Sequence, residues 1–151
     1  MKGKAFILVG HENWGKSQSL KSLTDNNHHV RRIIINGKEL LIRRMSNDDQ
    51  PESLLRRVKK IDPQRRTHVI LTLCPNFHNP SRYTVNILNE LAEKYELFFW
   101  VLKFKYATNK AISEDEIKRL EQYGTVEVFG SGQAESKERV KGFKEFIEKK
   151  N

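Results

Sequence analysis

The architecture of this chain is set by one glycine-containing stretch, which reads Gly10-His11-Glu12-Asn13-Trp14-Gly15-Lys16-Ser17 and is called the glycine loop below. Five apolar residues, 5–9, precede it, and their composition predicts a buried β-strand. After the loop, Leu20 and Leu23 are spaced as on one face of a helix. We therefore expect a strand, the loop and a helix in direct succession. The alternative is a chance match in a surface turn, which the flanking context disfavours.

The residue types in the glycine loop suit the binding of phosphate. Gly10 and Gly15 permit backbone conformations that other residues avoid, so successive amides can turn inward and hold phosphate oxygens at a helix N-terminus. Lys16 is placed to reach the β- and γ-phosphates of a nucleotide, and the Ser17 hydroxyl is placed to ligate Mg²⁺. The residues expected to bind the nucleotide here are Gly10, His11, Glu12, Asn13, Trp14, Gly15, Lys16, Ser17 and Gln18.

This stretch resembles the Walker A loop of the P-loop NTPases. With Asn13 between the glycines and Leu20 and Leu23 after the lysine, it is similar to the form G-x-x-N-x-G-K-S-x-x-L-x-x-L of Ras-like and Era-like GTPases. It is also similar to the loop of ABC-type and SMC-type ATPases. The resemblance implies a P-loop NTPase fold that binds ATP or GTP with Mg²⁺, and it gives Lys16 a catalytic role.

The rest of the sequence predicts one α/β domain over residues 1–151. Asn36-Gly37 lies between two apolar runs and predicts a β-hairpin with a type I′ turn. Further strands are expected at residues 67–74, 97–102 and 125–129, alternating with helices that begin near Pro51, Pro80 and Glu114 and a last helix that contains Phe143 and Phe146. This alternation predicts a three-layer α/β/α sandwich whose sheet is mostly parallel, with one antiparallel hairpin strand.

Two of these helices have recognisable signals at their ends. Asn79-Pro80 predicts the start of a helix whose apolar face includes Val85, Leu88, Leu91, Ala92 and Tyr95. Ser113 and Glu116 form a capping box, and Gly124 is expected to end the helix that follows it.

An NTPase of this class has a second acidic residue that holds Mg²⁺ through water, at the end of a strand beside the glycine-loop strand. Strand 67–74 ends at Cys74 with no acid, and this single cysteine is expected to be a core residue. A Ras-like order would instead use the second arm of the hairpin, which Asp48 and Asp49 follow. Either aspartate is a metal candidate; alternatively Asp49 caps the next helix and Asp48 is solvated. Gln50 is the candidate for orienting the attacking water.

The sequence matches only part of the motif with which Ras-like GTPases recognise the base. Ras-like GTPases select guanine with an N-K-x-D motif, and Asn109 and Lys110 match its first half, but Ile112 stands where the aspartate is expected. Ser131 lies where that family's base-supporting loop falls. We therefore expect Asn109, Lys110 and Ser131 to lie near the base, without a prediction of ATP or GTP.

The composition favours a cytoplasmic protein with an anionic partner. The net charge is +9, and the sequence contains no apolar run of the roughly 18 residues that a membrane span needs. Residues 1–66 hold 15 Lys and Arg against 7 Asp and Glu, whereas the rest holds 13 against 12. This asymmetry predicts either a positive face for nucleic acid or a solvated surface spread around the domain. The cations concerned are Arg43, Arg44, Arg56, Arg57, Lys59, Lys60, Arg65 and Arg66.

Three functions agree with these features. The first is a nucleoside-triphosphate-binding protein that hydrolyses its ligand slowly, or only when a protein partner completes the site. The second is a nucleotide or polynucleotide kinase, although residues 104–113 lack the arginine-rich lid segment that such kinases usually have. The third is a catalytically inactive module of this kind that binds nucleic acid.

Overall fold

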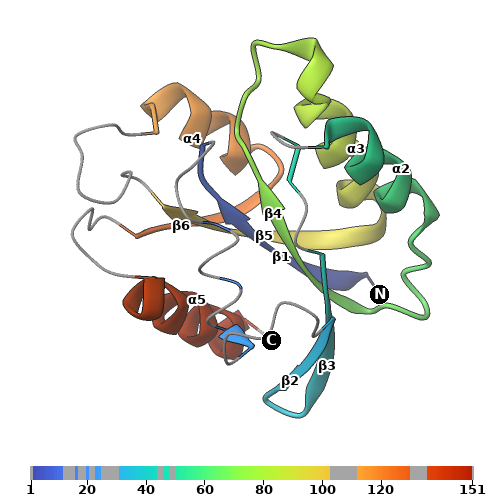
Figure 1. The fold of residues 1–151 in the computed structure, drawn as a ribbon, viewed down its shortest axis with the longest axis vertical. Coiled ribbons are helices and arrows are strands. Elements are labelled where there is room, and N and C mark those ends of the chain that lie inside the picture. Colours follow the sequence, from blue (N-terminus) through green and yellow to red (C-terminus); the bar gives the residue numbers. More distant parts are fainter. Residues whose placement is uncertain are drawn as a thin grey trace.

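The structure is a computed structural model. It describes residues 2–11, 16, 20, 23–24, 31–43, 46–47, 50–102, 112–129 and 136–150, the last range without the side chains of residues 136–140. Along the chain the elements are β1 (Gly3–Val9), β2 (Arg32–Ile35), β3 (Lys38–Ile42), α2 (Pro51–Lys60), β4 (His68–Leu73), the 3₁₀ turn η1 (Pro80–Arg82), α3 (Thr84–Lys94), β5 (Tyr95–Leu102), α4 (Glu114–Glu121), β6 (Gly124–Phe129) and α5 (Ser136–Lys150). Figure 1 shows their arrangement.

The six strands form one sheet in the order β2-β3-β4-β1-β5-β6. All neighbouring pairs are parallel except β2 and β3, which form the predicted antiparallel hairpin. Its turn residues, Asn36 and Gly37, have φ values of 56° and 78°, the positive values that a type I′ turn requires. The expectation of a mostly parallel sheet with one antiparallel hairpin strand is therefore confirmed.

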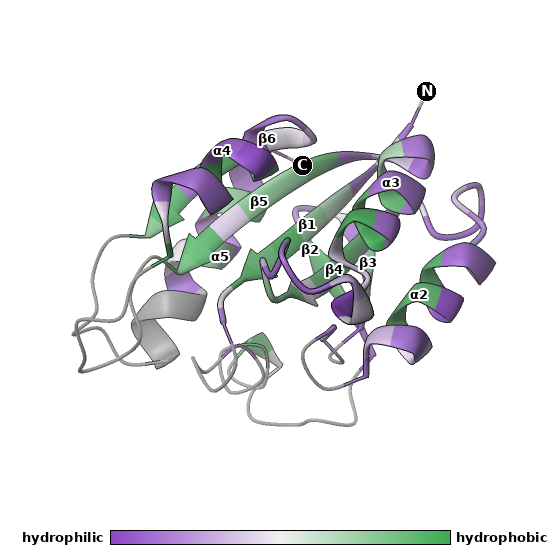
Figure 2. Ribbon diagram, turned by 90° about the horizontal axis from the view of Figure 1, so that it is seen from above, coloured by the Kyte–Doolittle hydropathy of each residue, from purple (hydrophilic) through white to green (hydrophobic). Residues whose placement is uncertain are grey.

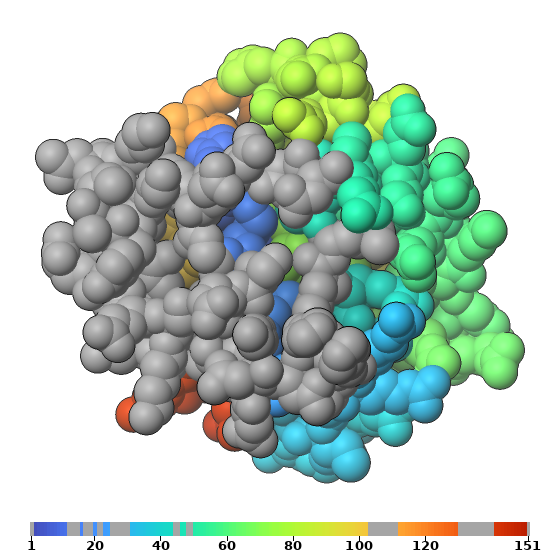
Figure 3. All heavy atoms as spheres, viewed as in Figure 1, coloured from blue at the N-terminus to red at the C-terminus, as the bar shows by residue number. Residues whose placement is uncertain are grey.

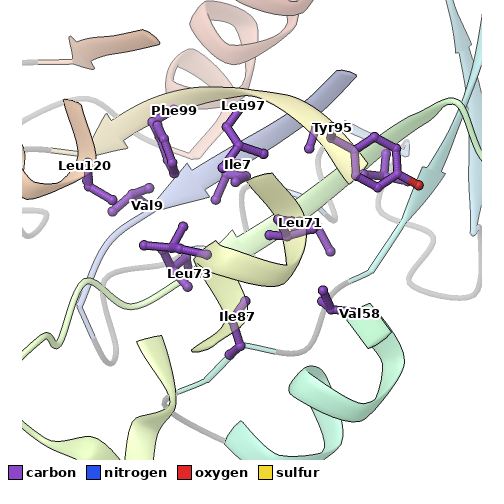
Figure 4. Packing of buried hydrophobic residues seen from close by; sticks show 14 of the residues in the cluster. Ile7, Val9, Val58, Leu71, Leu73, Ile87, Tyr95, Leu97, Phe99 and Leu120 are labelled. Atoms are coloured by element: carbon purple, nitrogen blue, oxygen red, sulfur yellow. The ribbon is translucent and has the colours of Figure 1, made fainter. Parts of the chain in front are cut away.

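Helices cover both faces of the sheet, and each face has its own apolar core. The first core joins the sheet to α2, α3 and α4 through residues such as Val58, Ile87 and Leu120 (Figure 4). The second core joins the other face to α5 and to Leu20 and is rich in aromatic rings. Figure 2 shows the same division, with apolar strands inside and hydrophilic helix surfaces outside. The arrangement is compatible with the predicted three-layer sandwich.

Two local expectations were wrong. Asn79 caps only the short turn η1, because Tyr83 adopts a left-handed conformation with φ of 55° and the helix restarts at Thr84. The buried face of α3 therefore includes Ile87, whereas Val85 is 41% exposed. Gly124 does not end a helix: it begins β6, and a Cβ there would lie 2.2 Å from the Leu97 carbonyl oxygen. Its close packing against β5, rather than a helix stop, requires glycine.

The strand order also differs from the Ras-like expectation. β3 pairs with β4, so the second arm of the hairpin is separated from β1 by a whole strand. The neighbours of β1 are β4 and β5. Asp48 and Asp49, which lie outside the described residues, thus follow a strand that is not adjacent to β1.

Phe146 of α5 tests the second core. Its side chain is 2% exposed and its ring centroid lies 5.4 Å from that of Trp100 and 6.4 Å from those of Phe6 and Phe98. We predict that Phe146→Ala lowers the free energy of unfolding by about 3–5 kcal/mol in urea denaturation, because it leaves a cavity among these rings. The control is Ile34→Ala, at a side chain that is 73% exposed, with an expected loss below about 1 kcal/mol. Equal losses in both variants would contradict the packing of α5.

Candidate phosphate-binding site

The beginning of the glycine loop lies at the carboxyl edge of the sheet, between two other strand ends. Val9, the last residue of β1, is level with Leu73 of β4 and Val101 of β5. The backbone N–H of Gly10 donates to the Leu73 carbonyl at 3.1 Å, which continues the β1–β4 ladder by one residue. Ligands of open α/β sheets bind outside the carboxyl ends of the strands, so this edge is the first place to look for a site.

The edge beside β1 is also where the connections change face. The segment that leaves β1 passes to the α5 face, where Leu20 is fully buried and Leu23 packs against the same core. The segments that leave β4 and β5 pass to the opposite face through α3 and α4. Adjacent strands whose connections go to opposite faces leave a crevice between them, the topological switch point. Gly10 and His11 lie at this point.

Lys16 folds back over the beginning of the loop. Its side chain is 6% exposed, and its ammonium Nζ donates to the Gly10 carbonyl at 2.5 Å and to the His11 carbonyl at 3.0 Å. Lys16 is helical in conformation, as are Leu20 and Leu23. Burial of an ammonium is costly unless it is hydrogen bonded, and these carbonyls meet part of that requirement. The positive charge is thus held at the carboxyl edge of the central strand.

His11 connects the loop to α4. Its Nε2 lies 2.9 Å from Oε2 of Glu116. The other oxygen of that carboxylate, Oε1, accepts hydrogen bonds from the backbone N–H and the hydroxyl of Ser113, at 2.9 and 3.0 Å. The predicted capping box is present, because the Ser113 hydroxyl also accepts from the Glu116 N–H. One carboxylate therefore caps α4 and holds the loop at the same time.

The surroundings of His11 favour its charged form. Hydrogen bonding to the Cys74 sulfur, 3.5 Å from Nδ1, and to Glu116 raises the pKa of His11 from 6.5 to about 9, against the opposing effect of burial. Burial would raise the pKa of Glu116, but the bonds from His11 and Ser113 outweigh it and hold that pKa below its ordinary value. At neutral pH the site therefore has an imidazolium paired with a carboxylate.

A buried amide organises the neighbouring strand end. Asn47 is fully buried; its Nδ2 donates to the Cys74 carbonyl and to the Thr84 hydroxyl, both at 3.0 Å, and its Oδ1 accepts from the Cys74 N–H at 2.7 Å. The Thr84 hydroxyl donates in turn to the Asn76 carbonyl at 2.6 Å. These bonds connect the segment after β3, the end of β4 and the start of α3. Where an NTPase of the predicted class would have a metal-binding acid, the end of β4 is bonded to an amide.

The structure places only some of the predicted site residues. Gly10, His11 and Lys16 lie together, because the Lys16 ammonium donates to the carbonyls of the other two. Gln50 is exposed at the start of α2, where its carbonyl accepts from the Leu54 N–H and its side chain makes no capping bond. The other predicted site residues lie outside the described part of the chain: Glu12, Asn13, Trp14, Gly15, Ser17, Gln18, Asp48, Asp49, Asn109, Lys110 and Ser131.

Sequence reasoning missed the contributions of Glu116, Cys74 and Asn47. Glu116 had a visible signal, because an imidazole in the loop requires a partner and the capping box offers a carboxylate. Cys74 was predicted to be a core residue and is 4% exposed, but its contact with His11 could not be read from the sequence. Nothing in the local sequence distinguishes Asn47 from a turn residue.

Three further findings bear on the kind of site. Among the described residues, no group of three or more His, Cys, Asp or Glu side chains converges as a metal site would. No helix in the described ranges is long and apolar enough to cross a bilayer. No protein-family model, curated protein or solved structure matches the chain significantly.

The His11–Glu116 pair gives a pH dependence of defined sign. The folded-state pKa of His11, about 9, lies above its ordinary value of 6.5. Its stabilising contribution is therefore fully present below pH 6.5 and is lost as the pH rises through about 9.

We predict that Glu116→Gln, which preserves the capping geometry, lowers the His11 pKa in an NMR titration. The difference in the free energy of unfolding between the wild-type protein and Glu116→Gln should become smaller as the pH rises toward 9. An unchanged His11 pKa in the variant would contradict the pairing.

Proposed function

We propose that this protein binds a nucleoside triphosphate with Mg²⁺ at the glycine loop. The observation that carries the proposal is the position of Lys16, whose buried ammonium is held at the carboxyl edge of the central strand by the first two carbonyls of the loop. A lysine that follows the second glycine of such a loop is suited to the β- and γ-phosphates of a bound nucleotide.

The charges around the loop support an anionic ligand. The Lys16 ammonium, which donates to the His11 carbonyl, and the His11 imidazolium are two positive groups of the loop, and Glu116 balances one of them. The switch point beside β1 is the position at which open α/β sheets bind their ligands. Phosphate would gain charge-assisted hydrogen bonds here, which are stronger than bonds between neutral groups.

Turnover of the ligand is expected to be slow or to depend on a partner. Among the described residues, the strand ends beside β1 are not followed directly by a carboxylate that could hold Mg²⁺. Glu116, the carboxylate that contacts the loop, uses both oxygens to bind His11 and Ser113. Ser17 remains a proposed metal ligand, and Gln50 remains the candidate for positioning water. The strand order no longer supports Asp48 and Asp49, but they directly follow Asn47, which is bonded to Cys74 at the end of β4, and on that ground they are proposed as metal ligands.

The sequence at the expected base-binding motif does not favour guanine over adenine. Ile112 occupies the position of the guanine-binding aspartate in the N-K-x-D motif, and its side chain is 2% exposed in the first core. It therefore does not supply a carboxylate to a guanine ring. Both ATP and GTP belong in the binding experiment.

Lys16→Ala tests the proposal directly. We predict that it weakens binding of ATP or GTP by about tenfold to a hundredfold in isothermal calorimetry, because it removes a charge-assisted contact to phosphate. Lys144→Ala, an exposed lysine on α5, is the control and should leave affinity unchanged. Circular dichroism checks that both variants fold. If Lys16→Ala binds like the wild-type protein, the glycine loop is not the nucleotide site.

The metal ligands are tested by repeating the titration with and without Mg²⁺. We predict that Ser17→Ala loses affinity only when Mg²⁺ is present, because its hydroxyl acts through the metal. Asp48→Asn or Asp49→Asn is expected to lower Mg²⁺-dependent hydrolysis while nucleotide binding persists. Equal affinity loss for Ser17→Ala in EDTA would refute its metal role. Unchanged hydrolysis in both aspartate variants would favour a protein that binds without using either residue for catalysis.

A further inference from the structure

A second positively charged region lies away from the glycine loop. A pocket of about 340 Å³ is bounded by β3, the last turn of α2 and the loop that leads to β4. Among the described residues, its wall has one acid, Asp62, and five cations, which are Arg43, Arg57, Lys60, Arg65 and Arg66. Figure 3 shows the hairpin, α2 and the loop before β4 along one flank of the molecule.

Three separate pieces of backbone bring the five cations together. Arg43 directly follows β3, and its N–H donates to the Ile70 carbonyl of β4 at 2.9 Å. Arg57 and Lys60 belong to the last turn of α2. The N–H groups of Arg65 and Arg66 both donate to the Asp62 carbonyl, at 3.1 and 2.9 Å. The pocket is therefore built on hydrogen-bonded backbone and not on the chance approach of long side chains.

Arg43 has a buried donor that is not used within the described structure. Its Nε–H is buried and meets no hydrogen-bond acceptor among the described residues. A buried donor without an acceptor costs free energy, and a missing ligand is one recognised reason for finding one. Burial lowers the pKa of the Arg43 guanidinium, and the charges of Arg57, Arg31 and Arg66 lower it further. An anion in the pocket would relieve both effects.

Two structural roles could explain basic residues at these positions, namely binding the carbonyls at the end of α2 and pairing with Asp62. Other groups already fill both roles. Cations at the end of a helix often compensate its exposed carbonyls. At the end of α2 that role belongs to Lys94 of α3, whose Nζ donates to the carbonyls of Val58, Lys59 and Ile61 at 2.7, 2.8 and 3.1 Å. The Asp62 carboxylate accepts from the Gln64 N–H at 3.0 Å and so serves its own turn. No carboxylate in the described chain lies within ion-pair distance of the five cations.

We propose that this pocket binds the phosphodiester backbone of a nucleic acid, with Arg43 holding one phosphate and the cations of α2 and its loop neutralising the adjacent ones. Five cations against one carboxylate exceed the charge of a single phosphate group, which is at most about −2. The positive surface also continues beyond the pocket, because Arg56 and Lys59 are exposed on α2. In the described lining of the pocket, the apolar residues are Leu41 and Ile61, and none of its side chains is an aromatic ring that could stack on a base. We therefore expect the protein to contact the phosphodiester backbone of the nucleic acid and to show only a slight preference for base sequence.

This region is independent of the proposed nucleotide site. Arg65 and Arg66 precede β4, whereas the glycine loop lies beside the other end of that strand. A strand of six residues spans about 20 Å. Arg43 is bonded to Ile70 in the middle of that strand. The two proposals depend on different residues, so failure of one leaves the other standing.

The experiment is fluorescence anisotropy of labelled single- and double-stranded oligonucleotides of about 20 nucleotides, titrated with the full chain from about 50 to about 200 mM salt. The wild-type protein is expected to bind, with an affinity that falls steeply with salt. Arg57→Gln combined with Lys60→Gln, and separately Arg43→Gln, should each weaken binding about tenfold or more at low salt. On a single strand, the slope of log affinity against log salt should become shallower by about 0.7 for each phosphate that the variant no longer neutralises.

The matched control is Lys141→Gln combined with Lys144→Gln on α5, which removes the same charge from exposed positions elsewhere. It should change affinity by less than about twofold if the pocket, and not net charge, attracts the strand. Equal losses in the two double variants, or absent binding at low salt, would overturn the proposal. Displacement of the oligonucleotide by equimolar pyrophosphate would also overturn it, by assigning the pocket to a small phosphate ligand. If Arg43→Gln does not fold, the α2 double variant, which alters exposed side chains only, still decides the question.

Discussion

The burial of β1 between two parallel neighbours is the constraint on which the rest of the structure depends. Its last five residues, 5–9, are at most 1% exposed, because β4 and β5 flank them and helices cover both faces. A strand buried on all sides must end in a loop that emerges between two other strand ends. That loop starts with Gly10, so the central position of β1 brings the loop, the end of β4 and the start of α4 within reach of one another. The bonds of Lys16, His11 and Glu116 follow from this placement.

Much of the fold was predictable because its signals are local. Asn36-Gly37 identified the hairpin, and Ser113 with Glu116 identified the start of α4; both patterns act over a few residues. Strand order was not predictable in the same way, since nothing near β3 or β4 in sequence determines which of them pairs with β1. The start of α3 was misplaced because Tyr83 adopts a conformation that its own residue type does not favour. For the site, the loop residues were visible in sequence, whereas Glu116 and Asn47 act across distances that only the assembled sheet defines.

The charged groups fall into two arrangements with different physical character. Around the glycine loop, cations are few and each has close partners: Lys16 has backbone carbonyls, and His11 has a carboxylate. Around Arg43 the described residues of the pocket include five cations and a single acid, Asp62, whose carboxylate accepts a hydrogen bond within its own turn. The first arrangement suits a small ligand held in defined geometry, and the second suits an extended polyanion whose attraction is mostly electrostatic. The basic excess of residues 1–66 is thus concentrated in part at one pocket and is not wholly a uniform surface.

The bonds of Asn47 have a consequence for how the chain folds. They connect residues that are 27 and 37 positions apart in sequence, and so join two connections of the sheet, the one from β3 to β4 and the one from β4 to β5. Contacts between such distant residues form only after the intervening strands and helices are in place, because the entropy of closing those long segments has to be overcome first. Until β4 has inserted beside β3 and α3 has packed over it, the amide has no partners. We therefore expect the contacts at the carboxyl edge of the sheet to form late in folding.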